Sequence, residues 1–424
     1  MGQLLVIRLG RLQPKGKGGT IKHAMDLISP APFWPLKDGL QGIYPPLREN
    51  LSCDVVVLGG GISGALVAER LAREGLKVVV LDKRHVGAGS TSASTALLQY
   101  EIDTPLVELT KMYGQADAER AYWLCHESID AIEGLVRSLG LEEIFQRKPS
   151  VYLASRRGDV KFLEQEGAAR RAAGIEVEFI DRAEVARRFS FEREGALVSK
   201  QAAQLDCYKF THALLARAVK QGARIFDRTT VEKHEPEETG VRLTTDRGFV
   251  VTAGHAIFAG GYESQEFLPK KVVSLKSTYA FATEPLEEFP GWWERCLIWE
   301  TAKPYMYLRT TDDGRALMGG EDDDFRNPVR RDALVDRKTA KLAKKFGEMF
   351  PQIELDVAYR WAGTFGETKD GLAYIGAVRQ MPRCFFVLGF GGNGITYSAI
   401  AADIIRDELM GKMNADARLF RFDR

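Results

Sequence analysis

The sequence has 424 residues, 45% of them hydrophobic and 28% charged, and its 59 basic residues nearly balance its 58 acidic ones, giving a formal net charge of +1. This composition predicts a globular protein of two domains and argues against nucleic acid or an anionic membrane as its main partner. No apolar run reaches the about 18 residues of a membrane-spanning helix, the N-terminus lacks the pattern of a signal peptide, and the 5 cysteines form no CxxC pair, so we expect a cytoplasmic protein without a metal site or disulfides.

Residues 1–50 are predicted to form an extended N-terminal leader. Its first part is basic and rich in glycine, and residues 27–50 carry five of the 16 prolines together with Phe33 and Trp34. Because proline is excluded from helix interiors, this stretch should run extended. Two placements are open: across the body of the protein near the mouth of a site, or along the surface, held by Trp34.

The most informative stretch begins at residue 54. Residues 55–58 are a short apolar run, typical of a strand buried on both faces, and residues 78–81 are a second one. Between them, Gly59, Gly61 and Gly64 stand at GxGxxG spacing, and the residues that follow them have helical periodicity. Asp82 closes the second strand. This order is the pattern of a dinucleotide-binding unit, and the alternative is a βαβ unit without a ligand.

Each part of this unit meets a requirement of dinucleotide binding. Gly59 permits the tight turn, Gly61 lets the main chain approach a pyrophosphate, and Gly64 lets the helix pack closely on the sheet. The helix start, at Ile62 and Ser63, offers N–H groups and the positive end of the helix dipole to phosphates. Asp82, followed by Lys83, is placed to accept hydrogen bonds from a ribose.

A small polar loop follows at residues 87–95, and its Gly89, Ser90, Thr91 and Ser92 are candidates for a phosphate-binding or ring-binding face, with an ordinary loop as the alternative. Residues 105–139 predict one long or broken helix, and residues 160–173 predict a charged helix exposed to solvent.

A second set of glycine corners is expected further along the chain. Asp206 opens a predicted helix, and a hairpin begins at Val231. A buried strand, residues 255–258, ends at Ala259 and Gly260, so a second glycine turn follows a second strand. A dinucleotide domain built from separated segments requires this arrangement.

Residues 272–325 predict a strand-rich second lobe. Tyr305, Tyr307 and Arg309 alternate with apolar residues and therefore share one face of a strand. That face either holds a substrate, with Tyr307 and Arg309 as contacts, or is exposed to solvent.

The last glycine-rich turn begins a helix. A strand at residues 385–388 leads into Gly391, Gly392, Asn393, Gly394, Ile395 and Thr396, and residues 398–410 are helical by periodicity. The N-terminal end of this helix suits a partly negative acceptor.

Together these features resemble the FAD-dependent oxidoreductases that include D-amino acid oxidase, glycine oxidase, sarcosine oxidase and γ-glutamylputrescine oxidase. The resemblance runs from residue 54 to residue 411 and includes the opening unit, GAGSTSAS, the AGG turn, YLRTTDDGRALMGG, TKDGLAYIG and GFGGNGIT. It implies an α/β fold: a Rossmann-like FAD-binding domain assembled from residues 51–143, 200–265 and 360–424, with an α+β substrate domain on a mostly antiparallel sheet, residues 144–199 and 266–359.

The resemblance also implies roles for individual residues. The opening glycines bind the FAD pyrophosphate, Asp82 binds the adenosine ribose, and the strand at Val231 touches the adenine. The loop at residues 89–95 and the GFGGNGIT turn flank the isoalloxazine ring. The substrate lobe covers the flavin.

Three departures from the family pattern bear on the chemistry. Phe365 takes the place of the arginine that pairs with a substrate carboxylate in the glycine oxidase branch, a contact that a phenyl ring cannot replace. Gly363 takes the place of the cysteine that attaches flavin in monomeric sarcosine oxidase, so we expect non-covalent FAD. The lysine that activates oxygen in some members is not recognisable after Gly320.

The implied reaction oxidises the C–N bond of an amine or amino acid. A hydride passes to flavin N5, the imine is hydrolysed, and oxygen or an electron carrier accepts the electrons. Three alternatives are a dehydrogenase of an amine or hydroxy acid with a non-oxygen acceptor, a flavin-binding subunit without turnover, and an NAD dehydrogenase. The last is disfavoured because it leaves the terminal glycine turn unexplained.

Overall fold

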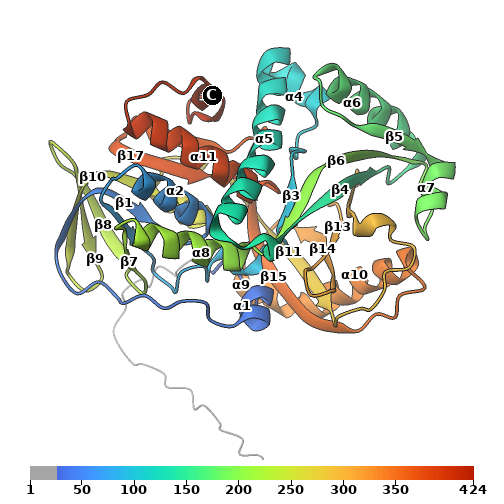
Figure 1. Ribbon diagram of the computed structural model, residues 1–424, viewed down its shortest axis with the longest axis horizontal. Helices are drawn as coiled ribbons and strands as arrows, with labels where there is room; N and C mark the ends of the chain where they lie inside the picture. Colours follow the sequence, from blue (N-terminus) through green and yellow to red (C-terminus); the bar gives the residue numbers. More distant parts are fainter. Residues whose placement is uncertain (1–25) are drawn as a thin grey trace, which may run out of the picture.

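The computed structural model describes residues 26–424, which form two β-sheets joined by helices (Figure 1). This arrangement confirms the predicted α/β fold class. The halves of the molecule lie side by side, and the long helix α5 (Gln115–Leu139) runs between them. No helix in this part of the chain is both long and apolar enough to cross a membrane. All five cysteines are buried and unpaired.

The first sheet has the parallel core that the sequence predicts. Its strands β17, β10, β1, β2 and β7 run parallel in that order, β16 is antiparallel at one edge, and the hairpin β8–β9 extends from β10. Leu58 of β1 is in register with both Phe258 and Leu81, so the strand ends that precede the glycine turns lie at one edge of the sheet. Such an edge is where open α/β sheets bind ligands. The strands are β1 (Leu51–Leu58), β2 (Val78–Leu81), β7 (Arg224–Phe226), β8 (Val231–Pro236), β9 (Val241–Thr245), β10 (Val250–Phe258), β16 (Tyr374–Val378) and β17 (Met381–Leu388).

Helices α2 (Ile62–Arg73), α8 (Cys207–Lys220) and α11 (Gly394–Leu409) lie together over this sheet (Figure 1). Asp206 caps α8, as predicted, by accepting the N–H groups of Tyr208 and Lys209. The predicted long helix is broken: α4 (Leu106–Tyr113) ends where Gly114 adopts φ 83°, and α5 begins at the next residue.

The second sheet has nine strands in the order β15-β11-β14-β13-β12-β4-β6-β3, with β5 also paired to β6. Among the described strands of this sheet only β4 and β12 pair in parallel, which agrees with the predicted mostly antiparallel sheet. Three of its strands, β3, β6 and β15, lie wholly or mostly within segments assigned above to the FAD-binding domain; the division into domains stays a prediction. The strands are β3 (Leu97–Gln99), β4 (Phe145–Leu153), β5 (Glu178–Asp181), β6 (Gly195–Leu205), β11 (Ser274–Thr283), β12 (Leu297–Glu300), β13 (Tyr307–Thr310), β14 (Ala316–Asp323) and β15 (Val357–Glu367).

The remaining helices cover the second sheet and fill the connections. On α10, Leu342 and Phe346 are fully buried and pack with Phe281 and Met318 in one core cluster. These elements are α6 (Val160–Ala172), α7 (Arg182–Arg188), α9 (Pro328–Ala333), α10 (Val335–Met349) and the short 3₁₀ helices η1 (Glu142–Ile144), η2 (Arg157–Asp159), η3 (Gly261–Phe267), η4 (Trp293–Arg295) and η5 (Ala415–Phe420).

The described part of the leader departs from the predicted extended form. Residues 1–25 lie outside the described range, and α1 (Phe33–Asp38) is a short helix. Pro35 is tolerated because it stands in the first turn, where its missing N–H would have no partner within the helix. Phe33 and Trp34 are both fully buried. The leader is therefore part of the folded body.

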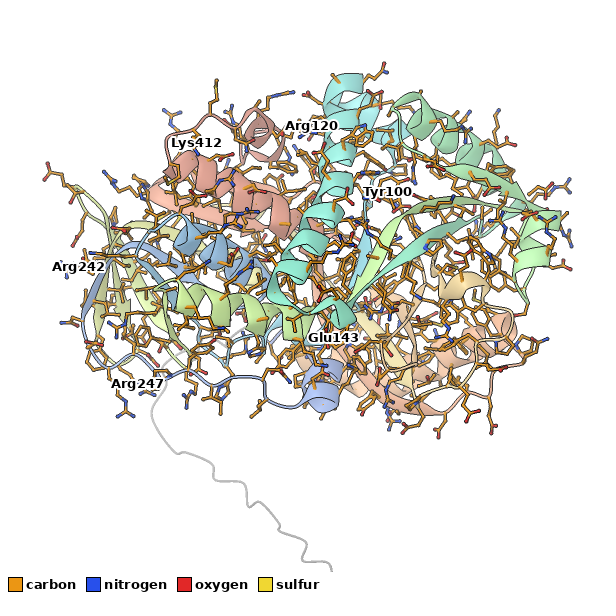
Figure 2. All side chains as sticks on the ribbon, in the orientation of Figure 1. Tyr100, Arg120, Glu143, Arg242, Arg247 and Lys412 are labelled. Atoms are coloured by element: carbon orange, nitrogen blue, oxygen red, sulfur yellow. The ribbon has the colours of Figure 1, made fainter. Side chains whose placement is uncertain are left out.

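The prediction of a solvent-exposed helix at residues 160–173 was wrong for one face of α6. Glu166 and Arg170 are buried, form an ion pair of 2.8 Å, and lie beside Tyr100 and Tyr122. Figure 2 shows Tyr100 well inside the molecule, near α5. A charged pair four residues apart therefore marked a buried ion pair rather than a solvated face.

Candidate active site

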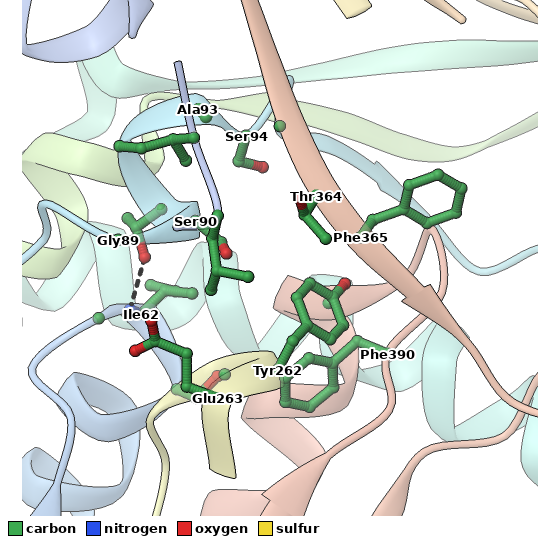
Figure 3. Close-up of a pocket in the computed structure, with 18 of the residues that line it drawn as sticks. Ile62, Gly89, Ser90, Ala93, Ser94, Tyr262, Glu263, Thr364, Phe365 and Phe390 are labelled. Carbon is green, nitrogen blue, oxygen red and sulfur yellow. Dashed lines mark hydrogen bonds between the residues drawn. The ribbon is translucent and has the colours of Figure 1, made fainter. Parts of the chain in front are cut away.

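One cavity of about 420 Å³ lies between the two sheets (Figure 3). Gly61, Gly260 and Gly394, from the three glycine turns, all line it, and strands of the second sheet provide its other wall. The sequence required that residues 61 and 394 lie close together, and the fold meets that requirement. Within the described chain, Ser63 of α2 and Ser398 of α11 are joined by a hydrogen bond of 2.7 Å between their hydroxyls.

The first turn depends on glycine at two positions. Gly59 has φ +112°, and a Cβ there would meet the Ala259 carbonyl oxygen at 2.6 Å. A Cβ on Gly64 would lie 1.8 Å from the Gly59 carbonyl oxygen, so α2 approaches its own preceding turn too closely for any side chain. Gly64 does not line the cavity; it packs behind it.

Asp82 is bound to the turn that it faces. Its Oδ2 accepts the Gly60 N–H at 2.7 Å and its Oδ1 accepts the Arg84 N–H at 2.8 Å. Burial raises the pKa of Asp82 to about 6, against the lowering effect of these two hydrogen bonds. Because each carboxylate oxygen has two lone pairs, this carboxylate fixes the turn and still presents acceptors to the cavity.

Charged groups concentrate at this end of the cavity. Glu263, on η3, accepts Lys83 Nζ at 3.0 Å and the Arg84 guanidinium at 2.6 and 3.1 Å. Sequence reasoning missed Glu263; its position just after the AGG turn was the available signal. Val231 and Phe258 line the same end.

The small polar loop holds an unpaired donor. Ser90 Oγ is buried and lacks a hydrogen-bond partner within the described chain. Thr91 Oγ1 accepts the Ile62 N–H at 3.0 Å, the dashed line at Ile62 in Figure 3, and so ties this loop to the start of α2. Ser92 lies behind the cavity and donates its hydroxyl to the Gly89 carbonyl. The loop forms the short helix α3 (Ser90–Ala93).

Arg309 does not lie where the sequence placed it. Its guanidinium is fully buried and donates to the main-chain carbonyls of Thr95, Ala96, Leu205 and Thr310, at 2.8 to 3.1 Å. It does not line the cavity, whereas Tyr307 does. Tyr305, predicted on the same strand face, precedes β13 (Tyr307–Thr310), and the Arg309 guanidinium stabilises the end of the polar loop instead of contacting the cavity.

The terminal glycine turn is held by hydrogen bonds to the end of β3 and to the segment that follows it. Asn393 Nδ2 donates to the carbonyls of Gln99 and Glu101, at 3.0 and 2.9 Å. Asp103 Oδ2 accepts the Gly392 N–H at 2.8 Å, and its Oδ1 accepts the Tyr305 hydroxyl at 3.1 Å. These contacts aim the start of α11 at the cavity, where its first N–H groups have no side-chain cap.

Two aromatic rings form part of the wall of the cavity. Tyr262 and Phe390 are buried and lie together below β15, as Figure 3 shows. Thr364 and Phe365 leave β15 on opposite sides in that view, and both line the cavity. The leader reaches this wall as well: Leu27 and Ile28 line the cavity, and Ile28 pairs antiparallel with Gly363. Of the two placements left open, this is the one near the site.

The second sheet supplies rings and a carboxylate. Trp299, Tyr305 and Tyr307 line the cavity, with ring centroids 6.3 and 5.9 Å apart in that order. Burial, followed by the charge of Asp322, raises the pKa of Tyr307 to about 12. Burial also raises the pKa of Asp322 to about 6, although the Thr278 hydroxyl donates to it.

Most of the predicted cofactor residues meet at this cavity. Gly64, Ser92 and Thr396 lie behind it, and Thr396 donates its hydroxyl to the Asn393 carbonyl. The predicted residues that line it are Gly59, Gly61, Ile62, Ser63, Asp82, Lys83, Gly89, Ser90, Thr91, Val231, Ala259, Gly260, Gly391, Gly392, Asn393, Gly394 and Ile395. Their individual roles stay predictions.

Residues 54–408 match the DAO family, described as FAD dependent oxidoreductases. The chain belongs to this family. It is therefore an enzyme, an FAD-dependent oxidoreductase, and the predicted resemblance is confirmed.

The relatives of this oxidoreductase agree with the family match. It is 26% identical over 400 residues to a putative Rieske 2Fe-2S iron-sulfur protein of Bacillus subtilis (strain 168), covering 92% of this chain and 75% of that protein. It is 25% identical over 388 residues to gamma-glutamylputrescine oxidoreductase of Escherichia coli (strain K12), covering 87% and 86%. The crystal structure of glycine oxidase from Geobacillus kaustophilus shares its fold, with a TM-score of 0.73, 21% identity and coverage of 86% and 96%.

The cavity of this oxidoreductase fits FAD. The turn after β1 leaves no room for side chains at Gly59 and Gly64, and Ser90 Oγ lacks a partner that a phosphate or ring oxygen would supply. The starts of α2 and α11 converge on the same space, where their dipoles favour negative groups.

Proposed function

We propose that this enzyme oxidises the C–N bond of an amine or amino acid with non-covalently held FAD. The observation that carries the proposal is the convergence of three glycine turns and Ser90 on a cavity whose other wall is the second sheet. The names of relatives point the same way, since gamma-glutamylputrescine oxidoreductase and glycine oxidase act on substrates of this class.

Non-covalent binding is supported by the residues that line the cavity. Within residues 26–424, none of the lining residues is a cysteine or a histidine. Gly363, at the position predicted to replace the attaching cysteine, lines the cavity and would bring a Cβ no closer than 3.8 Å to its nearest neighbour, Ala93. A precipitation step that denatures the protein should therefore release free FAD.

The protein itself binds the cofactor, orients the substrate and excludes water from the site. The turn at Gly61 and the start of α2 would hold the pyrophosphate of FAD, Asp82 would accept hydrogen bonds from its ribose, and the start of α11 would stabilise negative charge on the flavin. Tyr262 and Phe390 form an apolar wall that keeps water from the reacting carbon. Tyr307 contacts the substrate from β13.

FAD, when bound, would supply the two-electron acceptor for this oxidation, in which the substrate loses a hydride from carbon as its nitrogen lone pair forms the C=N bond, and oxygen or another carrier would reoxidise the cofactor. Water adds to the imine and releases a carbonyl compound and the amine or ammonia. The lining of the described cavity includes no histidine, so the chain offers no imidazole base for this step.

A dehydrogenase that passes electrons to a carrier is the second candidate. One observation favours it: Lys83, at the ribose end, is the only lysine among the described lining residues. No lysine of that lining stands beside the second sheet, so the cation that activates oxygen in some family members has no counterpart there.

Anaerobic flavin reduction tests the function. Purified protein with its FAD is mixed with primary amines, secondary amines, D-amino acids and hydroxy acids, and loss of the oxidised flavin band is followed. Bleaching by an amine or amino acid is expected. Bleaching by hydroxy acids alone, or by nothing in the panel, contradicts the proposal. Oxygen consumption compared with dye reduction then separates an oxidase from a dehydrogenase.

A further inference from the structure

The substrate end of the cavity has carboxylates but no cation. Of the described lining residues only Lys83 and Arg84 carry a positive charge, and both pair with Glu263 at the ribose end. Glu101, Asp103 and Asp322 line the opposite side. A substrate carboxylate would find no partner here, and it would meet three groups of its own charge.

The three carboxylates differ in the hydrogen-bond and ion-pair partners that they already have within the protein. Asp103 accepts Gly392 N–H and Tyr305 O–H, so both of its oxygens are used to hold the terminal turn. Glu101 is 5% exposed, and its Oε2 also lacks a hydrogen-bond partner in the described chain, but its Oε1 lies 3.6 Å from Arg170, which partly neutralises the carboxylate. Asp322 has a buried Oδ1 without any partner in the described chain, and no ion pair within 4.0 Å is found for it there. Asp322 is therefore the carboxylate that a cationic ligand would complete.

The nearest basic side chains do not change this assignment. Lys276 raises the ionised fraction of Asp322 by its charge but is bound to Glu367 at 2.8 Å and Asp324 at 3.3 Å. Neither Lys276 nor Lys303, whose charge acts on Asp103, lines the cavity. Asp103 and Glu367 add negative potential around Asp322.

Aromatic rings line the cavity together with this carboxylate: the charge of Asp322 acts on Tyr305 and Tyr307, and Trp299 contacts Tyr305. The Trp299 ring stacks on Tyr152 with centroids 3.7 Å apart, which fixes its orientation. Tyr307 lies across Gly319, where a Cβ would meet its ring at 2.4 Å. Trp and Tyr faces attract cations, and a carboxylate beside them adds a charge-assisted hydrogen bond.

We propose that Asp322, walled by Trp299, Tyr305 and Tyr307, binds an ammonium group of the substrate, and that the substrate is a diamine or polyamine without an α-carboxylate. The assignment rests on the proposed function. The oxidised nitrogen must be uncharged to donate its lone pair, whereas a nitrogen held by a carboxylate is kept protonated. The two tasks therefore fall to two different nitrogens of one substrate.

Three probes with the same four-carbon chain test the proposal on the FAD-loaded protein. They are 1,4-diaminobutane, 1-aminobutane, which lacks the second nitrogen, and ornithine, which adds an α-carboxylate to the diamine. The concentration for half-maximal anaerobic flavin reduction should be at least about tenfold lower for the diamine than for the other two. This comparison needs no variant.

Binding without turnover is measured with tetramethylammonium, which has no lone pair to donate, by calorimetry and by its effect on the flavin spectrum. Asp322→Asn should weaken this binding about tenfold, and the matched variant Asp324→Asn, which removes the same charge from an 88% exposed side chain, should not. The Asp322→Asn protein should also need about tenfold more diamine, with the limiting reduction rate changed less.

The outcomes separate this inference from the function on which it rests. Ornithine equal to or better than the diamine, or tetramethylammonium binding unaffected by Asp322→Asn, overturns the ammonium site and leaves the oxidation of C–N bonds standing. Flavin that no amine or amino acid bleaches, together with tetramethylammonium binding that depends on Asp322, overturns the function and retains the site.

Discussion

The two ends of the cavity each carry a partly buried carboxylate whose pKa is raised to about 6 by desolvation, yet they are built in different ways. Asp82 stands in the same strand–turn–helix–strand unit as the groups it binds, and both of its oxygens accept main-chain N–H groups. Asp322 stands at the end of β14, among rings from β12 and β13, with one oxygen unpartnered. The Asp82 end is thus encoded within 30 residues, whereas the Asp322 end is assembled from distant strands.

The largest effect, on flavin content, is expected at the turn before α2, where Gly64 packs too closely on Gly59 for any side chain. Gly64→Val places side-chain atoms where even a Cβ would lie 1.8 Å from the Gly59 carbonyl oxygen. Either α2 moves off its turn or the turn changes shape, at a cost of about 1–3 kcal/mol or more. We expect purified Gly64→Val protein to lack flavin, measured as visible absorbance per protein.

Gly134→Ala on α5 is the matched control, because a Cβ there meets nothing within 4 Å. It should retain flavin and unfold at the same or a slightly higher urea concentration. Full flavin occupancy in Gly64→Val would show that the pyrophosphate is not held at this turn.

The second effect belongs to the leader, which contacts both the polar loop and strand β15. Trp34 is fully buried and donates its indole N–H to the Ser94 carbonyl at 2.7 Å, and Phe33 stacks on Trp361 of β15. Trp34→Ala should lower the free energy of unfolding by about 3–5 kcal/mol, measured by urea denaturation. Leu36→Ala, at a side chain on the same helix that is 55% exposed, should change it little. Equal stability of Trp34→Ala and wild type would mean that the leader is not part of the folded core.

The sequence predicted those features whose residues are close together in the chain. Gly59, Gly61, Gly64 and Asp82 could be assigned because spacing alone defines the turn, and the strands that carry the other glycine corners have continuous apolar runs. Arg309 shows the limit: alternation gave its strand face, but only the fold shows that it ends under the polar loop.

Contacts between distant segments left no readable pattern. Glu263 and Asp103 bind groups far from them in sequence, Arg84 and Gly392 respectively, so no local spacing marks them. The short helix α1 was missed because Pro35 was taken as a helix breaker, whereas its place in the first turn is compatible with a helix. Asp322 was missed because it is one of three consecutive aspartates, and the sequence does not tell which of them faces inward.

A third prediction tests the assignment of the Asp82 end to the nucleotide. Asp82→Asn should raise the dissociation constant of FAD about tenfold, because a charge-assisted acceptor for the ribose is lost. FMN has no adenosine, so its dissociation constant should not change. Titration of flavin-free protein with each cofactor, followed by fluorescence, measures both. An equal loss for FAD and FMN would mean that Asp82 acts only by holding the Gly60 turn.

The smallest expected effect is on the free energy of unfolding, which ionised Asp322 lowers. Its pKa is raised from 3.8 to about 6, so the folded chain favours the protonated carboxyl. Ionised Asp322 therefore opposes folding: the penalty is absent below pH 3.8, grows as the pH rises to about 6, and is constant above that. Asp322→Asn removes this penalty, in which the attraction of Lys276 is already included, and should stabilise the protein at pH 7 by about 1–2 kcal/mol.

Thermal midpoints of wild type and Asp322→Asn, both with excess FAD, measure this difference from pH 4 to pH 8. Asp82 titrates in the same range but is present in both proteins, so the difference between them isolates Asp322. The variant should be the more stable above pH 6, and the two should converge near pH 4. A more stable variant would mean that the protein retains Asp322 although it costs stability, as expected for a group that binds a ligand. A variant less stable than wild type at pH 7 would instead mean that Asp322 has a structural role, as the acceptor of the Thr278 hydroxyl.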